Sequence, residues 1–265
     1  MASDRILVAV VDGRLRMCRV GSRTTDVPWT GQARARVEDG RIVLDGPDVG
    51  GGRQVIGAGE VAPIGGALAS CHDVSSQQGE PLVVRFGTSM VASSPAMIRV
   101  FHVAACVARR DSPILLLGES GTGKDLLARE LHRLGRGADR PYVAVNMAAL
   151  PPDLAEAELF GWMRGSFTGA GDSREGAFEA AATGTLFLDE IGEAAPFLQA
   201  KLLRVLQERQ IDRVGGKEPL ALDFRVIATT NRDIEALIRE GAFRQDLFYR
   251  LNVIPIKIPS LRARP

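Results

Sequence analysis

The stretch that decides the fold is Ile114-Leu-Leu-Leu-Gly-Glu-Ser-Gly-Thr-Gly-Lys124. Its first four residues form a solid apolar run, which is typical of a buried strand in a parallel sheet. A glycine-rich segment follows directly, and the residues after Lys124 have helical periodicity. A strand, a glycine-rich loop ending in lysine and a helix, in this order, predict a phosphate-binding P-loop. The alternative is a glycine-rich turn without a ligand, which the complete context disfavours.

The P-loop predicts a nucleotide site for ATP with Mg²⁺. Glycines in such a loop let backbone N–H groups turn toward phosphate oxygens, and the N-terminus of the following helix adds partial positive charge. The lysine then reaches the β- and γ-phosphates. The predicted nucleotide-binding residues are Gly118, Glu119, Ser120, Gly121, Thr122, Gly123, Lys124 and Asp125.

Asp125 departs from the general P-loop pattern, in which Ser or Thr follows the lysine and holds Mg²⁺. Its carboxylate could contact the metal or the waters of the metal. It could equally be an acid in the first helical turn that favours the helix N-terminus. The residues themselves leave both interpretations open.

A second half of the site is predicted where the apolar segment 185–188 ends in Asp189 and Glu190. Asp189 is the expected partner of Mg²⁺. Glu190 is the expected base that orients and activates the attacking water. The alternative is a pair of exposed helix-cap acids, which the P-loop upstream disfavours.

The chain divides into two parts by pattern. Residues 1–86 have short apolar runs punctuated by Gly and Asp, which predicts a small β-rich domain. Residues 87–265 alternate between strand and helix patterns, so we expect an α/β domain: a parallel sheet with helices on both faces and active loops at the strand ends. Strands are predicted over 114–117, 142–145, 185–189, 224–229 and 253–258, and helices over 95–109, 123–134 and 197–209.

Composition excludes several classes of function. Hydrophobic residues are 45%, charged residues are 25% and the net charge is +1, so nothing global demands nucleic acid or a membrane surface. There is neither an 18-residue apolar run nor a signal-peptide start. Three cysteines at no metal-ligand spacing favour a reduced, cytoplasmic chain. No basic recognition helix or zinc-finger spacing is present, so no direct DNA binding is predicted.

Five motifs in a fixed order support a resemblance. The chain resembles the AAA+ ATPase domain of bacterial enhancer-binding proteins, the activators of sigma-54 RNA polymerase, over about residues 88–265. The Gly-x-Phe-Thr-Gly-Ala pattern is the most specific motif, because P-loop ATPases in general lack it. The family normally has an acid after the P-loop lysine, which makes Asp125 less unusual. The motifs are Gly118-Glu-Ser-Gly-Thr-Gly-Lys124, Glu158-Leu-Phe-Gly161, Gly165-Ser-Phe-Thr-Gly-Ala170, Gly184-Thr-Leu-Phe-Leu-Asp-Glu-Ile191 and Phe243-Arg-Gln-Asp-Leu247.

The resemblance implies a mobile loop tip that contacts sigma-54 in the RNA polymerase holoenzyme. Phe167 and Thr168 would be the contact residues, and Ser166 replaces the usual first alanine. A Phe between glycines suits an apolar anchor on a loop that moves. The alternative is a plain turn with its Phe in the core. The implied contact residues are Gly165, Ser166, Phe167, Thr168, Gly169 and Ala170.

The resemblance also assigns roles to two asparagines. Asn146 matches the residue that hydrogen-bonds the catalytic glutamate, here Glu190, although a strand-end Asn in a turn is the competing interpretation. Asn231 matches the sensor residue near the γ-phosphate, or it caps the helix that begins near Asp233.

Arg244 and Arg250 match the trans-acting arginines of the family. A planar guanidinium suits a phosphoryl group that spreads its charge in the transition state. If a neighbouring subunit supplies them, hydrolysis requires a ring of copies. The alternative for each is a surface salt bridge, for instance with Asp246.

The resemblance stops at both ends of the chain. The family's helical lid and DNA-binding helix-turn-helix would follow Pro265, so we interpret the chain as a fragment, a truncated product or a degenerate member, with weak turnover alone. The family places a regulatory module where residues 1–86 lie. A forkhead-associated domain is one candidate, although its landmark residues are absent, and a structural β-domain is the other.

Three functions remain open from the sequence. The first is an ATP-hydrolysing regulator that remodels sigma-54 RNA polymerase for promoter opening. The second is a generic AAA+ remodeller, which the segment 165–170 disfavours. The third is a truncated module that binds nucleotide and sigma-54 without hydrolysis.

Overall fold

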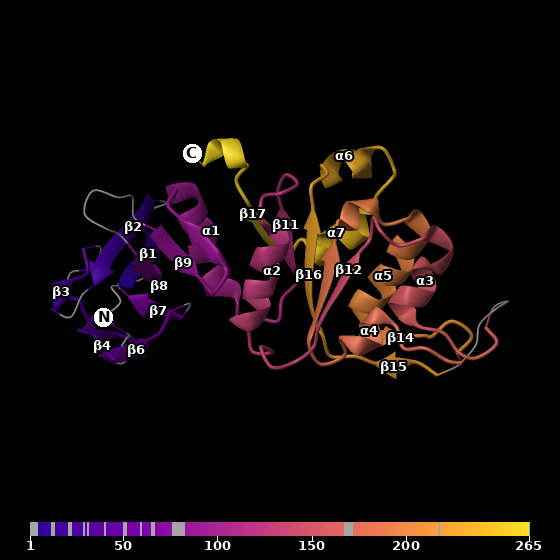
Figure 1. Cartoon of the computed structure of the whole chain (residues 1–265), viewed down its shortest axis with the longest axis horizontal. Helices are drawn as coiled ribbons and strands as arrows, with labels where there is room; N and C mark the ends of the chain where they lie inside the picture. The colour runs from indigo at the N-terminus through magenta and orange to yellow at the C-terminus, as the bar shows by residue number, and fades with distance from the viewer. Residues whose placement is uncertain are drawn as a thin grey trace. The chain divides into compact units, whose positions relative to one another are not determined.

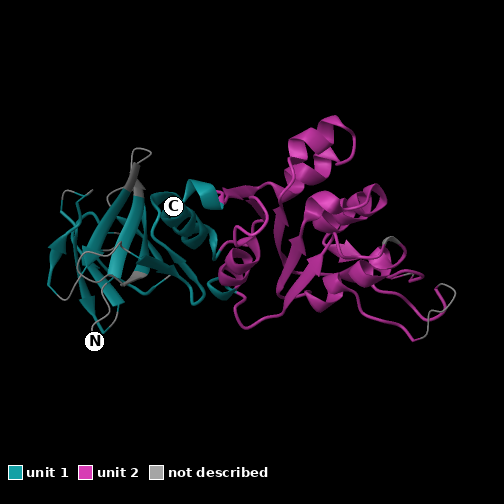
Figure 2. Ribbon diagram, turned by 45° about the horizontal axis from the view of Figure 1, so that its top comes forward, with its two compact units in different colours: residues 1–109, 133–136, 261–265 teal, residues 110–132, 137–260 magenta. Residues whose placement is uncertain are grey.

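The computed structural model describes residues 5–11, 14–20, 23–28, 30, 32–39, 41–49, 52–58, 60–64, 67–75, 83–166, 172–216 and 218–264. Two compact units make up the chain (Figures 1 and 2). Unit 1 contains residues 1–109, 133–136 and 261–265. Unit 2 contains residues 110–132 and 137–260.

Unit 1 is built on antiparallel strands, which confirms the prediction of a β-rich N-terminal segment. One sheet has the order β10-β9-β8-β1-β2, with β7 paired to β8, and a second has the order β3-β4-β5-β6. Apolar side chains of both sheets, such as Leu7 and Leu44, share one buried core. The strands are β1 (Arg5–Val11), β2 (Arg14–Val20), β3 (Thr25–Asp26), β4 (Arg34–Glu38), β5 (Arg41–Asp45), β6 (Arg53–Ile56), β7 (Val61–Ile64), β8 (Ala67–Ser75), β9 (Val83–Phe86) and β10 (Met90–Ala92).

Helix α1 (Pro95–Val107) also belongs to unit 1. It starts at the Ser94 cap, whose side chain accepts a hydrogen bond from the backbone N–H of Met97. Phe101 is buried and stacks on Phe86 at 5.1 Å between ring centroids. Because α1 packs on β8 and β1, this unit extends past residue 86. The division into domains at residues 86 and 87 stays a prediction.

Unit 2 is a five-stranded parallel sheet of order β12-β13-β16-β11-β17. Its central strands are mostly apolar and mostly buried, as expected for a sheet packed on both faces. Helix α2 lies on one face, and α3, α5 and α7 lie on the other (Figure 1). The predicted α/β class is therefore confirmed. The strands of this sheet are β11 (Ile114–Leu117), β12 (Tyr142–Asn146), β13 (Thr185–Asp189), β16 (Arg225–Thr230) and β17 (Ile254–Lys257).

Helices α2 and α5 of unit 2 match the predicted helices 123–134 and 197–209 to within a few residues at their ends, whereas α3, α4 and α7 were not predicted from the sequence. Strands β14 (Gln210–Ile211) and β15 (Leu220–Ala221) form a separate small hairpin. The helices are α2 (Lys124–Arg133), α3 (Pro152–Phe160), α4 (Ala177–Ala180), α5 (Pro196–Glu208), α6 (Ile234–Arg239) and α7 (Gln245–Leu251), with 3-10 turns η1 (Ile191–Glu193) and, in unit 1, η2 (Leu261–Ala263).

Candidate functional site

The P-loop connects the carboxyl end of β11 to the first turn of α2. Gly121 and Gly123 have φ values of 76° and 92°, a region that favours glycine. Lys124 starts the helix and is 7% exposed. Its ammonium donates hydrogen bonds to the carbonyl oxygens of Gly118 at 3.0 Å and Glu119 at 3.2 Å. The lysine head is therefore held at the inner surface of the loop.

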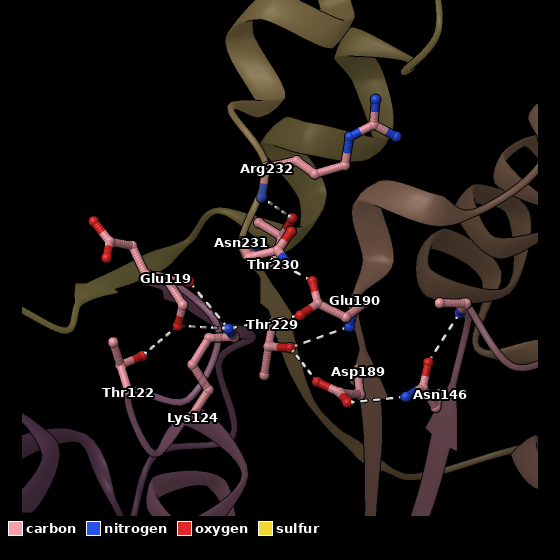
Figure 3. A network of polar contacts seen from close by, with 12 residues as sticks. Glu119, Thr122, Lys124, Asn146, Asp189, Glu190, Thr229, Thr230, Asn231 and Arg232 are labelled. Carbon is pink, nitrogen blue, oxygen red and sulfur yellow. Dashed lines mark hydrogen bonds and ion pairs between the residues drawn. The ribbon is translucent and has the colours of Figure 1, made fainter. Parts of the chain in front are cut away.

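The two acids at the end of β13 lie beside this lysine (Figure 3). The Glu190 carboxylate is 3.6 Å from the Lys124 ammonium, and it accepts a hydrogen bond from the backbone N–H of Asn231 at 3.0 Å. Strands β11, β13 and β16 are neighbours in the parallel sheet, so their carboxyl ends meet at one edge. Ligands of open α/β sheets bind at this edge. The structure thus brings together Lys124, Asp189 and Glu190, three residues that the sequence analysis singled out.

Thr229, at the end of β16, is a site residue that the sequence analysis missed. Its hydroxyl donates a hydrogen bond to Asp189 at 2.6 Å and accepts one from the backbone N–H of Glu190 at 3.1 Å. A second threonine, Thr230, follows it, so the sequence carried a detectable signal. Two hydroxyls follow the apolar run of the strand that was predicted over 224–229.

Asn146 lies in the site, but its contact differs from the expected one. Its side-chain N–H donates to Asp189 at 3.4 Å rather than to Glu190, and its side-chain oxygen accepts from the backbone N–H of Ala148. The reason is the strand register, because Asn146 pairs directly with Asp189 in the parallel ladder. The expected hydrogen bond of Asn146 to Glu190 stays a prediction.

Asn231 contributes its backbone to the site. Its N–H is the donor that holds Glu190, which places residue 231 next to the two acids. The alternative of a helix-capping Asn231 is wrong, since Asp233 caps α6 by accepting from the backbone N–H of Ala236.

Asp125 lies in the first turn of α2, where one of the two interpretations places it, and its carboxylate pairs with Arg129 one turn along the helix at 3.1 Å. Both side chains are about half exposed, at 50% and 53%. The guanidinium of Arg129 also lies over the ring of Tyr142, 5.2 Å from its centroid. Asp125 is thus available at the edge of the P-loop, and its role toward a metal stays open.

Arg244 and Arg250 lie at the two ends of α7 and bind partners inside the chain. The Arg244 guanidinium makes two hydrogen bonds to Asp246, at 2.7 Å and 3.0 Å, and it lowers the pKa of that carboxyl. Arg250 donates twice to the carbonyl oxygen of Leu206, at 2.9 Å and 3.2 Å. The salt bridge with Asp246 that was considered from the sequence is present. A role for either arginine in a neighbouring subunit stays a prediction.

The base of the predicted sigma-54 loop is described, but most of its tip is not. Gly165 and Ser166 belong to the described residues, whereas residues 167–170, with the predicted contacts Phe167, Thr168, Gly169 and Ala170, lie outside them. Trp162 forms bridges to Arg174 and to Val214, so three chain segments are joined at the base. The loop therefore starts from a hydrogen-bonded platform.

A cavity of about 560 Å³ lies along the same edge of the sheet, next to the P-loop. Backbone and side chains from the ends of β11, β16 and β17 form most of its wall. The lining includes Leu117, Gly118, Glu119, residues 230–235, Phe248 and residues 257–260. The cavity is large enough for part of a nucleotide.

Comparison with known proteins decides the family. The model of the sigma-54 interaction domain matches residues 90–257, well over half of the chain. The chain belongs to this family. The Nif-specific regulatory protein of Azotobacter vinelandii is 53% identical over 68% of the chain and 34% of its own length. The regulatory protein AtoC of Escherichia coli K12 is 53% identical over 66% of the chain and 38% of its own length. The chain thus spans less than half the length of these relatives.

Solved structures give the same result for the sigma-54 interaction domain. NtrX from Brucella abortus, solved in complex with ATP, aligns with a TM-score of 0.62 and 39% identity over 68% of the chain and 40% of NtrX. NtrX has also been solved with ADP, with a TM-score of 0.62 and 40% identity. The predicted family resemblance and AAA+ fold are therefore confirmed. None of the helices that the structure describes combines the length and apolarity needed to cross a bilayer.

Proposed function

We propose that this chain is the ATP-driven part of a sigma-54-dependent transcriptional activator. It binds ATP, hydrolyses it and remodels the sigma-54 RNA polymerase holoenzyme for promoter opening in the cytoplasm. The observation that carries the proposal is the convergence of Lys124, Asp189 and Glu190 at one edge of the sheet, in a chain of the sigma-54 interaction family. The ATP complex of the related NtrX supports the nucleotide.

The residues at this edge fit a nucleotide with Mg²⁺. A Cβ added at Gly121 would have no atom within 4 Å, so the P-loop is open at that point to a phosphate group. Asp189 and Asp125 offer carboxylate oxygens, the hard ligands that Mg²⁺ prefers. Bound Mg²⁺ would neutralise phosphate charge, and Asp189 would hold it, with Asp125 as a second candidate.

The chain's own residues have separate roles in this proposal. Lys124 exchanges the carbonyl oxygens of the loop for the β- and γ-phosphates. Glu190 accepts a proton from the attacking water, and the backbone N–H of Asn231 orients its carboxylate. Asn146 orients Asp189 from the neighbouring strand. Asn231 also senses the γ-phosphate with its side chain.

Arg244 and Arg250 act on the nucleotide of the next copy in a ring. Each first has to leave its partner within the chain, Asp246 or the carbonyl of Leu206. This observation favours a second candidate function for an unassembled chain, which is nucleotide binding without turnover. The two functions differ in how hydrolysis depends on assembly.

Residues 165–170 contact sigma-54 in this proposal, with Phe167 and Thr168 at the interface. The bridges of Trp162 support it, because a platform at the base transmits movement to a loop tip. Residues 1–86 form the regulatory domain, and residues 87–265 form the ATPase domain.

The test is ATP hydrolysis per chain measured over a range of protein concentrations. A rate that rises with concentration, and that falls when Arg244→Ala is introduced, supports hydrolysis in an assembly. Nucleotide binding with no hydrolysis at any concentration supports the second candidate. A chain that fails to bind ATP contradicts both.

A further inference from the structure

The side chain of Thr229 lies between Asp189 and the backbone of Glu190. Thr229 is the last but one residue of β16, which lies between β13 and β11 in the sheet. In the parallel register, Ala228 pairs with Leu188, so residue 229 comes beside Asp189. Figure 3 shows its side chain between Asp189 and the backbone of Glu190.

The hydroxyl of Thr229 has a defined orientation. An ionised carboxylate only accepts hydrogen bonds, so the hydroxyl donates to Asp189, at 2.6 Å. A backbone N–H only donates, so the same oxygen accepts from Glu190, at 3.1 Å. Thr229 is 0% exposed, and water therefore does not compete for these contacts. One buried oxygen links the side chain of one acid to the backbone of the other.

The Glu190 backbone is in a conformation that costs free energy and has to be stabilised by its surroundings. It has φ 51° and ψ 51°, a left-handed conformation that non-glycine residues rarely adopt. This conformation turns the chain from β13 into η1 and directs the Glu190 carboxylate toward Lys124 and the N–H of Asn231. The hydrogen bond from the backbone N–H of Glu190 to the Thr229 hydroxyl fixes the start of this turn.

We propose that Thr229 is a positioning residue that sets the mutual geometry of Asp189 and Glu190. Its hydroxyl orients the carboxylate that holds Mg²⁺ and anchors the turn that presents the carboxylate facing the water. This inference rests on the roles of Asp189 and Glu190 in the proposed function. Thr230, the adjacent hydroxyl, accepts from the N–H of Arg232 instead, so the role belongs to one of the two threonines.

The experiment compares Thr229→Val, which keeps the shape and removes the hydroxyl, with Thr229→Ser, which keeps the hydroxyl. Binding of a fluorescent ADP analogue is measured in EDTA and over a MgCl₂ titration. Groups that orient metal ligands change metal affinity by about 10- to 100-fold. We expect Thr229→Val to need about tenfold more Mg²⁺ for half-maximal effect while its metal-free affinity stays within about twofold. Thr229→Ser should stay close to wild type.

Thr185→Val is the matched control. Thr185 is buried at the opposite end of β13 and hydrogen-bonds His132 at 2.9 Å, away from the acids. Thr185→Val should lower the melting temperature of the protein without changing the Mg²⁺ dependence of nucleotide binding. If Thr229→Val does not fold, Thr229→Ser and Thr229→Ala provide the same contrast, since they differ by one hydroxyl.

The outcomes distinguish a failure of the positioning role of Thr229 from a failure of the proposed function. An unchanged Mg²⁺ dependence in Thr229→Val, or an equal loss of affinity with and without metal, overturns the positioning role alone. A wild-type protein whose nucleotide binding ignores Mg²⁺ overturns the proposed function, and this inference with it.

Discussion

Glu190→Gln is expected to tighten ATP binding while it stops hydrolysis. In this structure, Lys124 is attracted both by two loop carbonyls and by the Glu190 carboxylate. ATP has to draw the lysine away from that carboxylate, and its γ-phosphate then faces a second negative charge. A neutral amide removes both obstacles and keeps the size of the side chain.

The magnitude follows from the geometry. Two unit charges 3.6 Å apart attract by about 4 to 5 kcal/mol at an effective dielectric constant of about 20. Most of this is offset, because the partly buried charges lose hydration and because the lysine keeps its carbonyl partners. A net change of about 1 to 2 kcal/mol corresponds to about 5- to 30-fold tighter ATP binding. Hydrolysis should fall by at least about 100-fold, the contribution of a positioned general base.

The assay is the equilibrium dissociation constant of a slowly hydrolysed ATP analogue, measured for wild type and variant at the same salt and Mg²⁺ concentrations. Glu193→Gln is the control, since Glu193 forms an exposed ion pair with Arg232, and it should change neither constant nor rate. Weaker binding of the analogue to Glu190→Gln would refute the competition between carboxylate and phosphate.

Three further outcomes are expected. Lys124→Ala should abolish ATP binding measured by calorimetry, because it removes the one basic side chain of residues 118–124. Lys201→Ala, on an exposed ion pair, should leave ATP binding unchanged. Phe167→Ala should abolish capture of sigma-54 with ADP and a metal fluoride but spare ATP binding, and undiminished capture would contradict the loop assignment. Burial lowers the pKa of His72 to about 4, so the unfolded chain binds a proton below pH 6.5 that the folded chain resists. Thermal unfolding should therefore show stability lost as pH falls from about 6.5 to about 4, up to about 3 kcal/mol, and His72→Gln should flatten that slope.

The central sheet was predictable because its signals are local. The apolar segment 114–117 and the loop after it carry the strand, the turn and the helix start in consecutive residues. Asp189 and Glu190 were predictable because they come at the end of an apolar strand, and Lys124 because it ends the glycine-rich loop after another strand; parallel strands end at the same edge of the sheet.

The contacts between those residues were not predictable in the same way. Whether Asn146 reaches Asp189 or Glu190 depends on the register of β12 against β13, which is a relation between distant segments. The two adjacent threonines were visible in the sequence, but the contacts of Thr229 with Asp189 and Glu190 depend on the pairing of β16 with β13, which neighbours in sequence do not show. The packing of α1 on β8 is likewise a long-range relation, and a helical pattern alone does not show which sheet the helix covers.

Three charged groups of the proposed site each have a partner within the chain. Lys124 binds loop carbonyls, Glu190 binds the N–H of Asn231, and Arg244 binds Asp246. Each partner occupies the hydrogen-bonding groups that a phosphate or a water would use, so a charge in this site keeps a partner before ligand arrives. The exchange differs in cost with burial. Lys124 is almost fully buried, so it would exchange the loop carbonyls for a phosphate in an enclosed site. The Arg244 side chain is 49% exposed, and its ion pair with Asp246 is screened by solvent. We therefore expect Arg244 to exchange its partner within the chain at a lower cost in free energy than Lys124.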